Sequence, residues 1–432
     1  MTTVLVVGNG GREHAIAWKL RQSPGVGRLY AAPGNTGTAR IAENVPIRAD
    51  DIDGLLRFVQ DKGIDLTVVG PEAPLAAGIA DRFQDAGLLL FGPTRAAARI
   101  ETSKSFAKAL MMRHGVPTGR AETFSSFERA SAYIETAQMP IVVKADGLAA
   151  GKGVATAATR DEALELVRRM LVERQYGDAG KKMLIEEHLE GKEISVFAFV
   201  DGLRVSPLVA ACDYKRAGDS DSGPNTGGMG SYCPPEEPIW DAGLERRIRV
   251  QIIEPVVGAL ADEGTPYRGV LYAGLMLTQE GPKVIEFNCR FGDPETQVIL
   301  PRLKSDLLEA MMKTARGDIG GLSLEWDARP CVGVVVASGG YPAGYRTGYP
   351  ISGLHDVGPD ALVFHAGTAL AQDGNVVTDG GRVLAIAALG STYHDARQRV
   401  YSIISRVNFT GSFYRKDIAD RASTMSAVPP RQ

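Results

Sequence analysis

Cysteine and histidine are scarce in this 432-residue sequence, and no cysteine pair has the spacing of a redox or zinc site. The four cysteines are Cys212, Cys233, Cys289 and Cys331. They lie far apart, which favours buried reduced thiols. The six histidines show no metal-ligand spacing, so we assign none to catalysis. His14 falls inside the first expected helix, where a structural role is the better interpretation.

Long apolar runs, a strong net charge and a targeting segment are also absent. No apolar stretch approaches the ~20 residues of a membrane-spanning helix. The formal net charge of −3 gives no electrostatic preference for nucleic acid or an anionic membrane. The first residues enter an apolar segment without a basic leader or cleavage site. We therefore expect a cytoplasmic protein, a monomer or weak dimer, with small-molecule partners and neither nucleic acid nor membrane.

The composition that remains is that of a globular protein, with 44% hydrophobic and 23% charged residues. The length allows about two to four domains. In the first hundred residues, the apolar runs TVLVVG, RLYAAPG, DLTVVGPE and LLLFGPT alternate with helical segments. Short apolar runs separated by helices predict a parallel sheet covered on both faces.

The pattern changes after this region. GVLYAGLML and PKVIEFN predict two paired strands joined by a turn at 279–281. Residues 219–235 are rich in Gly, Ser, Asn and Pro, which predicts a long loop. Beyond Pro330, the runs CVGVVVAS, ALVFHAG and GRVLAIAALG predict a small, mostly β terminal domain, with a helix over 393–404 packed on it.

Glycines follow the first expected strand, in GNGG at 8–11. Glycine lets the backbone approach a phosphate, and a helix N-terminus favours negative charge. A dinucleotide fingerprint, however, needs glycine at position 13, where Glu13 stands. The second strand ends in PGN, without the acidic residue that would hold a ribose hydroxyl. NAD binding is therefore disfavoured.

A phosphate or sugar site at this sheet edge remains a candidate, because three expected strands end there. The candidate residues are Gly10, Gly11, Glu13, Gly34, Asn35, Pro71 and Glu72. Glu13 and Glu72 could bind sugar hydroxyls or an amine. The alternative is that these glycines only form tight turns.

A second glycine-rich segment contains lysine and could close over the phosphates of a nucleotide. The candidate phosphate residues are Lys104, Lys144, Gly147, Gly151, Lys152 and Gly153. A P-loop is excluded, because Gly153 follows Lys152 where Ser or Thr is required. Glu186, Glu187 and Glu193 flank strand ends and could accept hydrogen bonds from adenine or ribose; the alternative is an exposed charged linker.

Glu286 and Asn288 are two residues apart on an expected strand, so their side chains share a face. A carboxylate and an amide oxygen suit Mg²⁺, which prefers oxygen ligands. Arg290, Asp293 and Glu295 follow at once. Such a convergence of ionisable groups favours a functional site over an internal ion pair, the alternative.

Nine motifs follow one another in an order that resembles one family. They are GNGGREHA at 8–15, APGNTGT at 32–38, VGPEAPL at 69–75, KADGLAAGKGV at 144–154, GPNTGGMG at 223–230, EFNCRFGDPE at 286–295, FHAGT at 364–368, GGRVL at 380–384 and YRKDI at 414–418. Over essentially the whole chain, the sequence resembles the glycinamide ribonucleotide synthetase family of the ATP-grasp superfamily.

The resemblance implies a fold that is α/β and α+β. An N-terminal Rossmann-like parallel-sheet domain (1–102) would bind the phosphosugar. A two-lobed ATP-grasp region (103–327) would follow, with its smaller nucleotide lobe at about 121–190, and then a mostly β C-terminal domain (328–432). The implied reaction is ATP-dependent ligation of glycine to 5-phosphoribosylamine through a glycyl phosphate, which gives glycinamide ribonucleotide, ADP and phosphate.

The resemblance also implies residue roles. The implied ATP contacts are Lys104, Lys144, Glu186, Glu187, Leu189 and Glu193, with the Leu189 backbone at adenine and Glu193 at the ribose. Glu286 and Asn288 would hold Mg²⁺ or Mn²⁺. Lys144 and Arg290 would stabilise the moving phosphoryl group, and Asp213 and Arg290 would hold glycine.

One departure concerns the wider superfamily: the strand YAGLMLT carries no further acidic metal ligand. Alternatives stay open. They are another ATP-grasp carboxylate–amine ligase or carboxylase, a nucleotide-binding regulatory protein, and an adenylate-forming enzyme that would release AMP.

Overall fold

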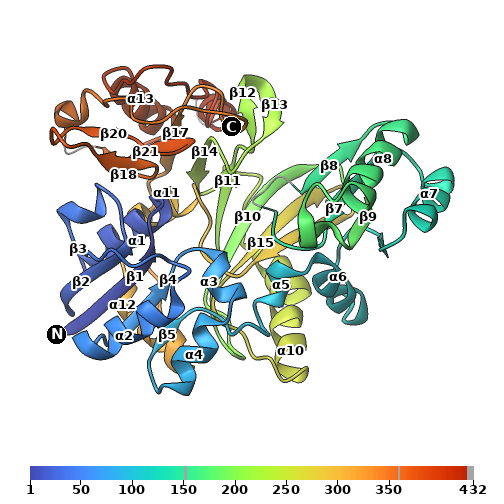
Figure 1. Ribbon diagram of the computed structural model, residues 1–432, viewed down its shortest axis with the longest axis horizontal. Coiled ribbons are helices and arrows are strands. Elements are labelled where there is room, and N and C mark those ends of the chain that lie inside the picture. Colours follow the sequence, from blue (N-terminus) through green and yellow to red (C-terminus); the bar gives the residue numbers. More distant parts are fainter. Residues whose placement is uncertain (150–152, 359–360, 426–432) are drawn as a thin grey trace, which may run out of the picture.

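The computed structural model describes residues 1–149, 153–358 and 361–425. Figure 1 shows an N-terminal part built on a sheet, a central body with a small lobe projecting from it, and a C-terminal part beside the N-terminal one. The predicted fold class is confirmed: a parallel sheet comes first, then an antiparallel two-lobed centre, then a small, mostly β part.

The N-terminal sheet has five parallel strands. In spatial order they are β3 (Glu43–Asn44), β2 (Val26–Pro33), β1 (Thr2–Gly8), β4 (Leu66–Val69) and β5 (Leu90–Phe91). The helices of this part are α1 (Gly11–Leu20), α2 (Ile52–Lys62), α3 (Glu72–Ala76) and α4 (Ile79–Asp85).

Strand β1 reads as a continuous apolar run because both of its faces are covered. Leu5 and Val7 belong to the core that contains α2 and α4, whereas Val4 and Val6 belong to the core that contains α1. That second face is also packed by α12 (Leu307–Arg316), a helix from far along the chain. A helix from a later part of the chain therefore helps to cover one face of the N-terminal sheet.

Local signals set the helix ends. Asp51 caps α2 by accepting a hydrogen bond from Gly54 N–H at 2.9 Å, and the helix ends at Gly63, whose φ is 61°. Ser103 caps α6 (Lys104–Arg113) in the same way, accepting from Phe106 N–H at 3.2 Å. The Ser103 cap places Lys104 at a helix N-terminus.

The central body is an eight-stranded antiparallel sheet that runs on into the C-terminal part. Its strands, in spatial order, are β16 (Gly281–Asn288), β15 (Arg268–Thr278), β10 (Lys192–Asp201), β11 (Val209–Asp213), β14 (Gly230–Cys233), β17 (Cys331–Ala337), β21 (Arg382–Leu389) and β18 (Leu362–His365). The predicted pairing of β15 with β16 is confirmed. One sheet thus spans the central and C-terminal regions.

The small lobe has its own four-stranded antiparallel sheet and its own core. Its strands are β6 (Ala121–Phe124), β9 (Met183–Glu187), β7 (Ile141–Ala145) and β8 (Val154–Ala157), covered by α7 (Phe127–Thr136) and α8 (Arg160–Val167). In the pairing of β7 with β9, Val142 lies opposite Glu186, so Lys144 and Glu186 share one face of the sheet.

The predicted long loop at 219–235 is wrong. The segment contains β13 (Ser222–Asn225), which pairs with β12 (Arg216–Gly218), and the whole of β14. Strand β14 is buried and pairs with β11 and β17. Its composition is poor in strand-forming residues, and pairing on both sides outweighs that local preference.

The remaining helices and strands are α5 (Arg99–Thr102), α9 (Ala242–Ile248), α10 (Glu254–Asp262), α11 (Thr296–Ile299), α13 (Tyr393–Ile404), α14 (Asp420–Met425), β19 (Thr368–Leu370) and β20 (Val376–Thr378). The predicted helix over 393–404 is confirmed. All four cysteines are buried and unpaired, as expected. Among the helices of the described residues, none has the length and apolar character to cross a bilayer.

Two buried histidines join α1 to the C-terminal part. His365 N–H donates to His14 Nδ1 at 2.9 Å. Burial lowers the pKa of His14 to about 3 and that of His365 to about 4. Both are therefore neutral in the fold, whereas in the unfolded chain they take up protons as the pH falls below about 6.5.

Because only the unfolded chain binds these protons, stability should fall as the pH drops from about 6.5 towards 4, by roughly 1 kcal/mol per pH unit for each histidine. Urea unfolding at a series of pH values measures this slope. His14→Gln should flatten it, whereas His394→Gln, at an exposed position on α13, should not. Equal slopes in wild type and His14→Gln would contradict the prediction.

Candidate active site

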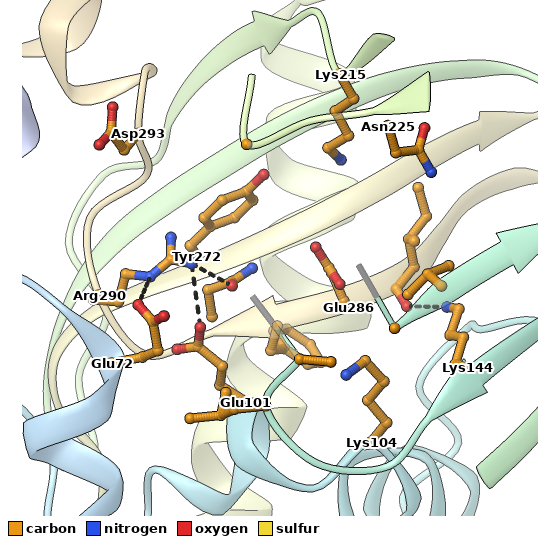
Figure 2. A pocket seen from close by; sticks show the side chains of 18 of the residues that line it. Glu72, Glu101, Lys104, Lys144, Lys215, Asn225, Tyr272, Glu286, Arg290 and Asp293 are labelled. Atoms are coloured by element: carbon orange, nitrogen blue, oxygen red, sulfur yellow. Dashed lines mark hydrogen bonds and ion pairs between the residues drawn. The ribbon is translucent and has the colours of Figure 1, made fainter. Parts of the chain in front are cut away.

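A cavity of about 570 Å³ lies where the N-terminal part, the small lobe, the central sheet and the C-terminal part contribute walls. Figure 2 shows acidic and basic side chains pointing into it from several elements. Twelve predicted site residues line it: Pro71, Glu72, Lys104, Lys144, Gly153, Glu186, Asp213, Glu286, Asn288, Arg290, Asp293 and Glu295. The cavity therefore gathers residues from 71 to 295 in one place.

Other predicted residues lie beyond this lining, among those that the structure describes: Gly10, Gly11, Glu13, Gly34, Asn35, Gly147, Glu187, Leu189 and Glu193. Gly151 and Lys152 fall outside the described residues. Gly147 packs against the small lobe, where a Cβ would meet Ala179 at 2.9 Å. The roles predicted for these residues stay predictions.

Two lysines of the small-lobe side surround the carboxylate of Glu186. Lys108 Nζ lies 2.6 Å from one oxygen, and Lys144 forms an ion pair with the other. Burial by itself would raise the pKa of Glu186, but Lys144 and Lys108 lower it overall. Glu186 therefore stays ionised and orients Lys144, whose Nζ also donates to the Ile285 carbonyl at 3.0 Å.

The other nucleotide candidates on this side are also paired. Glu187 faces outward and binds Arg120 at 2.9 Å and Lys283 at 3.7 Å. Glu193 forms an ion pair with Lys215, a cavity residue. Leu189 is half-buried in the connection between β9 and β10. Glu193 is thus next to the cavity, and Glu187 is not.

Glu286 differs from these carboxylates. Within residues 1–149, 153–358 and 361–425, no cation lies within ion-pair distance of its oxygens, although it points into the cavity (Figure 2). Burial would raise the pKa of Glu286, but Lys215, Lys144 and Lys104 around the cavity lower it. An ionised carboxylate without a direct partner is the donor that a hard cation requires.

Asn288 would supply a second oxygen, Oδ1, which in this structure accepts from Arg290 Nη2 at 3.0 Å. Among the described residues, no cluster of three or more His, Cys, Asp or Glu side chains could enclose a metal ion. The two side chains therefore fit a divalent cation whose other ligands are phosphate oxygens and water, which is common for Mg²⁺.

Arg290 is held between two carboxylates from different elements. Its Nε lies 3.4 Å from Glu72 Oε2, at the start of α3, and its Nη2 lies 3.2 Å from Glu101 Oε1, on α5. Figure 2 shows both contacts. Glu101 also accepts a hydrogen bond from Cys289 N–H at 2.7 Å. The internal ion pair that the sequence left as an alternative exists, and it fixes the guanidinium at the cavity wall.

The buried carboxylates of Asp213 and Glu295 both contact the hydroxyl of Ser195 on strand β10. Ser195 Oγ lies 3.4 Å from Asp213 Oδ1 and 3.2 Å from Glu295 Oε1, and Tyr272 Oη lies 2.8 Å away. Burial raises the pKa of Asp213 to about 6, with Lys215 opposing and Glu295 reinforcing that shift. Two carboxylates side by side have the chemistry to accept hydrogen bonds from a small ammonium group.

The N-terminal glycine turns enclose the side chain of Glu13. Its Oε2 accepts from Gly10 N–H at 2.6 Å, and its Oε1 lies 2.5 Å from Arg12 Nε. A Cβ on Gly70 would lie 2.0 Å from Glu13 Oε1, so only glycine fits there. Asn35 Nδ2 donates to the Asn9 carbonyl at 2.8 Å and holds a second turn. In this structure these residues shape the turns at the sheet edge.

Known proteins match this chain over nearly its whole length. The N, ATP-grasp (A) and C domain models of phosphoribosylglycinamide synthetase match residues 2–101, 102–296 and 331–421 in turn. The phosphoribosylamine–glycine ligase of Halalkalibacterium halodurans is 51% identical over 425 residues, covering 98% of each chain. That of Escherichia coli is 51% identical over 423 residues, covering 97% of this chain and 98% of its own.

The chain belongs to the phosphoribosylglycinamide synthetase family. The resemblance inferred from the nine motifs is confirmed. A solved phosphoribosylamine–glycine ligase from Thermotoga maritima has a TM-score of 0.85 and 34% identity, covering 97% of this chain and all of its own. The biotin carboxylase domain of Hydrogenobacter thermophilus 2-oxoglutarate carboxylase, solved with MgADP and bicarbonate, shares the fold at a TM-score of 0.71 and 16% identity, covering 96% and 92%.

The sequence reasoning did not identify every polar or charged residue of the cavity; among those it missed are Arg12, Glu101, Lys215, Tyr272 and Arg382. Arg12 and Arg382 stand inside two of the nine motifs, GNGGREHA and GGRVL, and Lys215 lies two residues after the predicted Asp213. Glu101 and Tyr272 had no such signal, because Glu101 lies in the short helix α5 and Tyr272 in the apolar strand β15, both outside the nine motifs.

Proposed function

We propose that the protein ligates glycine to 5-phosphoribosylamine through a glycyl phosphate, with ATP as the phosphoryl donor. The products would be glycinamide ribonucleotide, ADP and phosphate, in purine biosynthesis. The observation that carries the proposal is one cavity lined by Lys104 and Lys144, by the carboxylates Asp213 and Glu295, and by Glu286, which has no ion pair among the described residues. Another ATP-grasp ligase or a carboxylase is not favoured, because relatives at 51% identity are phosphoribosylamine–glycine ligases.

The chemistry explains why such a cavity is needed. A carboxylate does not react with an amine, because its leaving group would be oxide. Phosphorylation by ATP replaces that leaving group with phosphate, and the amine then attacks the acyl carbon. Catalysis is mainly positioning and charge neutralisation, so no nucleophilic side chain is required.

The nucleotide would lie between the small lobe and the central sheet. We place its phosphates near Lys104, Lys144, Gly147 and Gly153, its adenine at the Leu189 backbone and its ribose at Glu193. Burial, reinforced by Lys144, lowers the pKa of Lys104. A bound phosphate beside it would favour the protonated, positively charged form of the lysine. We retain 1–102, 103–327 and 328–432 as the proposed domains.

Mg²⁺ or Mn²⁺ would be held by Glu286 and Asn288 together with phosphate oxygens. The chemistry supplied by the bound ion would be neutralisation of phosphate charge. This chain's own residues would do the rest: Lys144 is already oriented by Glu186, and Arg290 is fixed by its two carboxylates. Both cations are thus in place before the substrates bind, which avoids reorganisation during the reaction.

Glycine would bind with its ammonium group near Asp213 and Glu295 and its carboxylate towards Arg290. Phosphoribosylamine would enter from the N-terminal side, with its phosphate on the glycine turns. The residues proposed to contact it are Gly10, Gly11, Glu13, Gly34, Asn35, Pro71, Glu72 and Asp293. Four buried thiols suit a cytoplasmic location, which is part of the proposal.

The raised pKa of Asp213 predicts a pH dependence for glycine binding. Only the ionised carboxylate attracts an ammonium group, and the pKa of about 6 means that ionisation is lost as the pH falls below that value. The KM for glycine should therefore rise about tenfold per pH unit below about 6. Asp213→Asn should raise the KM for glycine at every pH and abolish its further rise below about pH 6. An unchanged rise in the variant would contradict the assignment, and the KM for ATP serves as the internal control.

The function is tested by the products formed from ATP, Mg²⁺, glycine and freshly generated phosphoribosylamine. ADP and inorganic phosphate should appear together with glycinamide ribonucleotide, and only when both substrates are present. Formation of AMP would exclude an acyl phosphate. Absence of turnover with competent substrates would exclude the substrate pair.

A further inference from the structure

Residues 213–228 line the cavity at both of their ends, and the residues between extend away from it to the surface. Asp213 and Lys215 line the cavity at the start of this 213–228 segment, and Asn225 to Gly227 line it at the end. Between them, β12 and β13 run out to an exposed tip at residues 219–223. The positions of the cavity residues at both ends of the segment therefore depend on the contacts that hold β12 and β13.

The inner end is held by the C-terminal region. Arg382, on β21, donates from Nη1 to the Gly227 carbonyl and to the Asp293 carbonyl, both at 2.7 Å. Its Nη2 lies 3.2 Å from Asp293 Oδ2. Tyr341 Oη accepts from Gly227 N–H at 3.0 Å. Arg382 thus joins the 213–228 segment to the loop that follows Arg290.

The outer tip is held by the YRKDI motif, to which the proposed reaction gives no role. Arg415 is only 1% exposed, and its Nη1 donates to Asp221 Oδ1 at 2.8 Å and to the Arg216 carbonyl at 3.1 Å. Asp417 pairs with Arg415 at 2.7 Å and accepts from Ser220 N–H at 2.9 Å. Figure 1 shows β12 and β13 beside the C-terminal part of the chain, coloured red.

Backbone strain is concentrated in the same contact. Four non-glycine residues have a left-handed φ among the residues that the structure describes, and three lie here: Ser220 at 55°, Asp221 at 53° and Ala419 at 58°. Ala419 N–H donates to Tyr214 Oη at 2.9 Å, so it too touches the segment. Such conformations persist only where the surroundings hold them, which indicates a specified contact on both sides.

We propose that Arg415 and Arg382 are positioning residues for the ligation: the C-terminal region holds both ends of the 213–228 segment so that Asp213 and Lys215 face the acyl group. This inference rests on the proposed function. Arg415 is outside the cavity lining and acts through the segment, whereas Arg382 lines the cavity and acts through its contacts with Gly227 and Asp293. Their contacts lie away from Lys104 and Lys144, so the proposed phosphate contacts do not depend on them, whereas Lys215 pairs with Glu193 at the proposed ribose position and links the segment to the nucleotide.

A loosened segment has a specific chemical consequence. Water would attack the acyl carbon of glycyl phosphate in place of the amine, the bond from that carbon to the phosphate oxygen would break, and glycine and inorganic phosphate would form. ATP would be consumed without product. If positioning is lost, more than one molecule of ADP should form for each molecule of glycinamide ribonucleotide.

The test compares Arg415→Met, Arg415→Lys and Asp221→Asn in the full chain. Arg415→Met should raise the KM for glycine roughly 10- to 100-fold and raise the ratio of ADP to product. The KM for ATP should rise by no more than about threefold, because the pair of Lys215 with Glu193 is the link between the segment and the proposed nucleotide site. Arg415→Lys should partly restore both the glycine KM and the ADP ratio. Asp221 is 71% exposed and outside the cavity, so Asp221→Asn should shift both in the same direction by roughly two- to threefold without loss of fold.

Arg399→Met is the matched control, because Arg399 forms an ion pair with Asp395 on α13 at 2.9 Å, away from the cavity. It should change neither quantity. If Arg415→Met does not fold, Asp221→Asn decides. Unchanged glycine KM and unchanged ADP ratio in Asp221→Asn, or a parallel loss for glycine and ATP in Arg415→Met, would overturn the proposal. Failure of the wild type to form product would instead overturn the proposed function.

Discussion

Replacing Glu286 by Gln is expected to lower kcat by at least about 10³-fold while the fold stays intact. Glu286 is an ionised carboxylate of the cavity without a direct ion pair among the described residues, and Lys215, Lys144 and Lys104 lower its pKa. Gln keeps the shape but removes the charge that would hold a divalent cation and balance these lysines. Steady-state release of ADP measures the effect.

Glu280→Gln is the matched control for this variant. Glu280 lies in the turn before β16 and pairs with Lys283 at 2.7 Å on the outside of the molecule. Its loss should leave turnover unchanged. Thermal melting should give similar midpoints for both variants and the wild type. Near-normal turnover in Glu286→Gln would contradict the metal assignment, and a large drop in its melting temperature would assign Glu286 to the fold instead.

Replacing Arg290 by Met is expected to reduce both stability and activity. Its removal leaves Glu72 and Glu101 near each other without their shared cation. The loss of one partner of a buried pair costs about 3–5 kcal/mol, and the 17% exposure of the Arg290 side chain argues for the lower end, about 3 kcal/mol. Urea unfolding measures this difference, and kcat/KM for glycine should fall by about 10²-fold or more.

A double variant separates the two effects of Arg290. Glu101→Gln in the Arg290→Met background removes one of the stranded negative charges, so it should recover part of the lost stability. It should recover no activity, because the guanidinium is still missing. Recovery of activity with stability would show that Arg290 acts only in the fold. Unchanged stability in Arg290→Met would show that the ion pairs contribute nothing.

Local sequence signals predicted much of the framework. Asp51, Gly63 and Ser103 mark helix ends by chemistry that involves only their neighbours. The spacing of Glu286 and Asn288 placed both at the cavity, because alternation along a strand is also local. The prediction of a loop at 219–235 was wrong because β14 forms through non-local pairing, with residues 212–213 on one side and 331–334 on the other.

The sequence by itself determined the order of the three parts, the ends of their helices, the motifs of the family and the residue types at the cavity. Only the tertiary structure decided which charges meet. Glu186 lies between two lysines, Arg290 between two carboxylates, and Glu13 within its own turn. A periodic pattern gives the face on which a side chain lies, whereas its partner depends on how segments many residues apart pack. In this chain that packing separates Glu286, which is left open to the cavity, from the carboxylates that hold other residues in place.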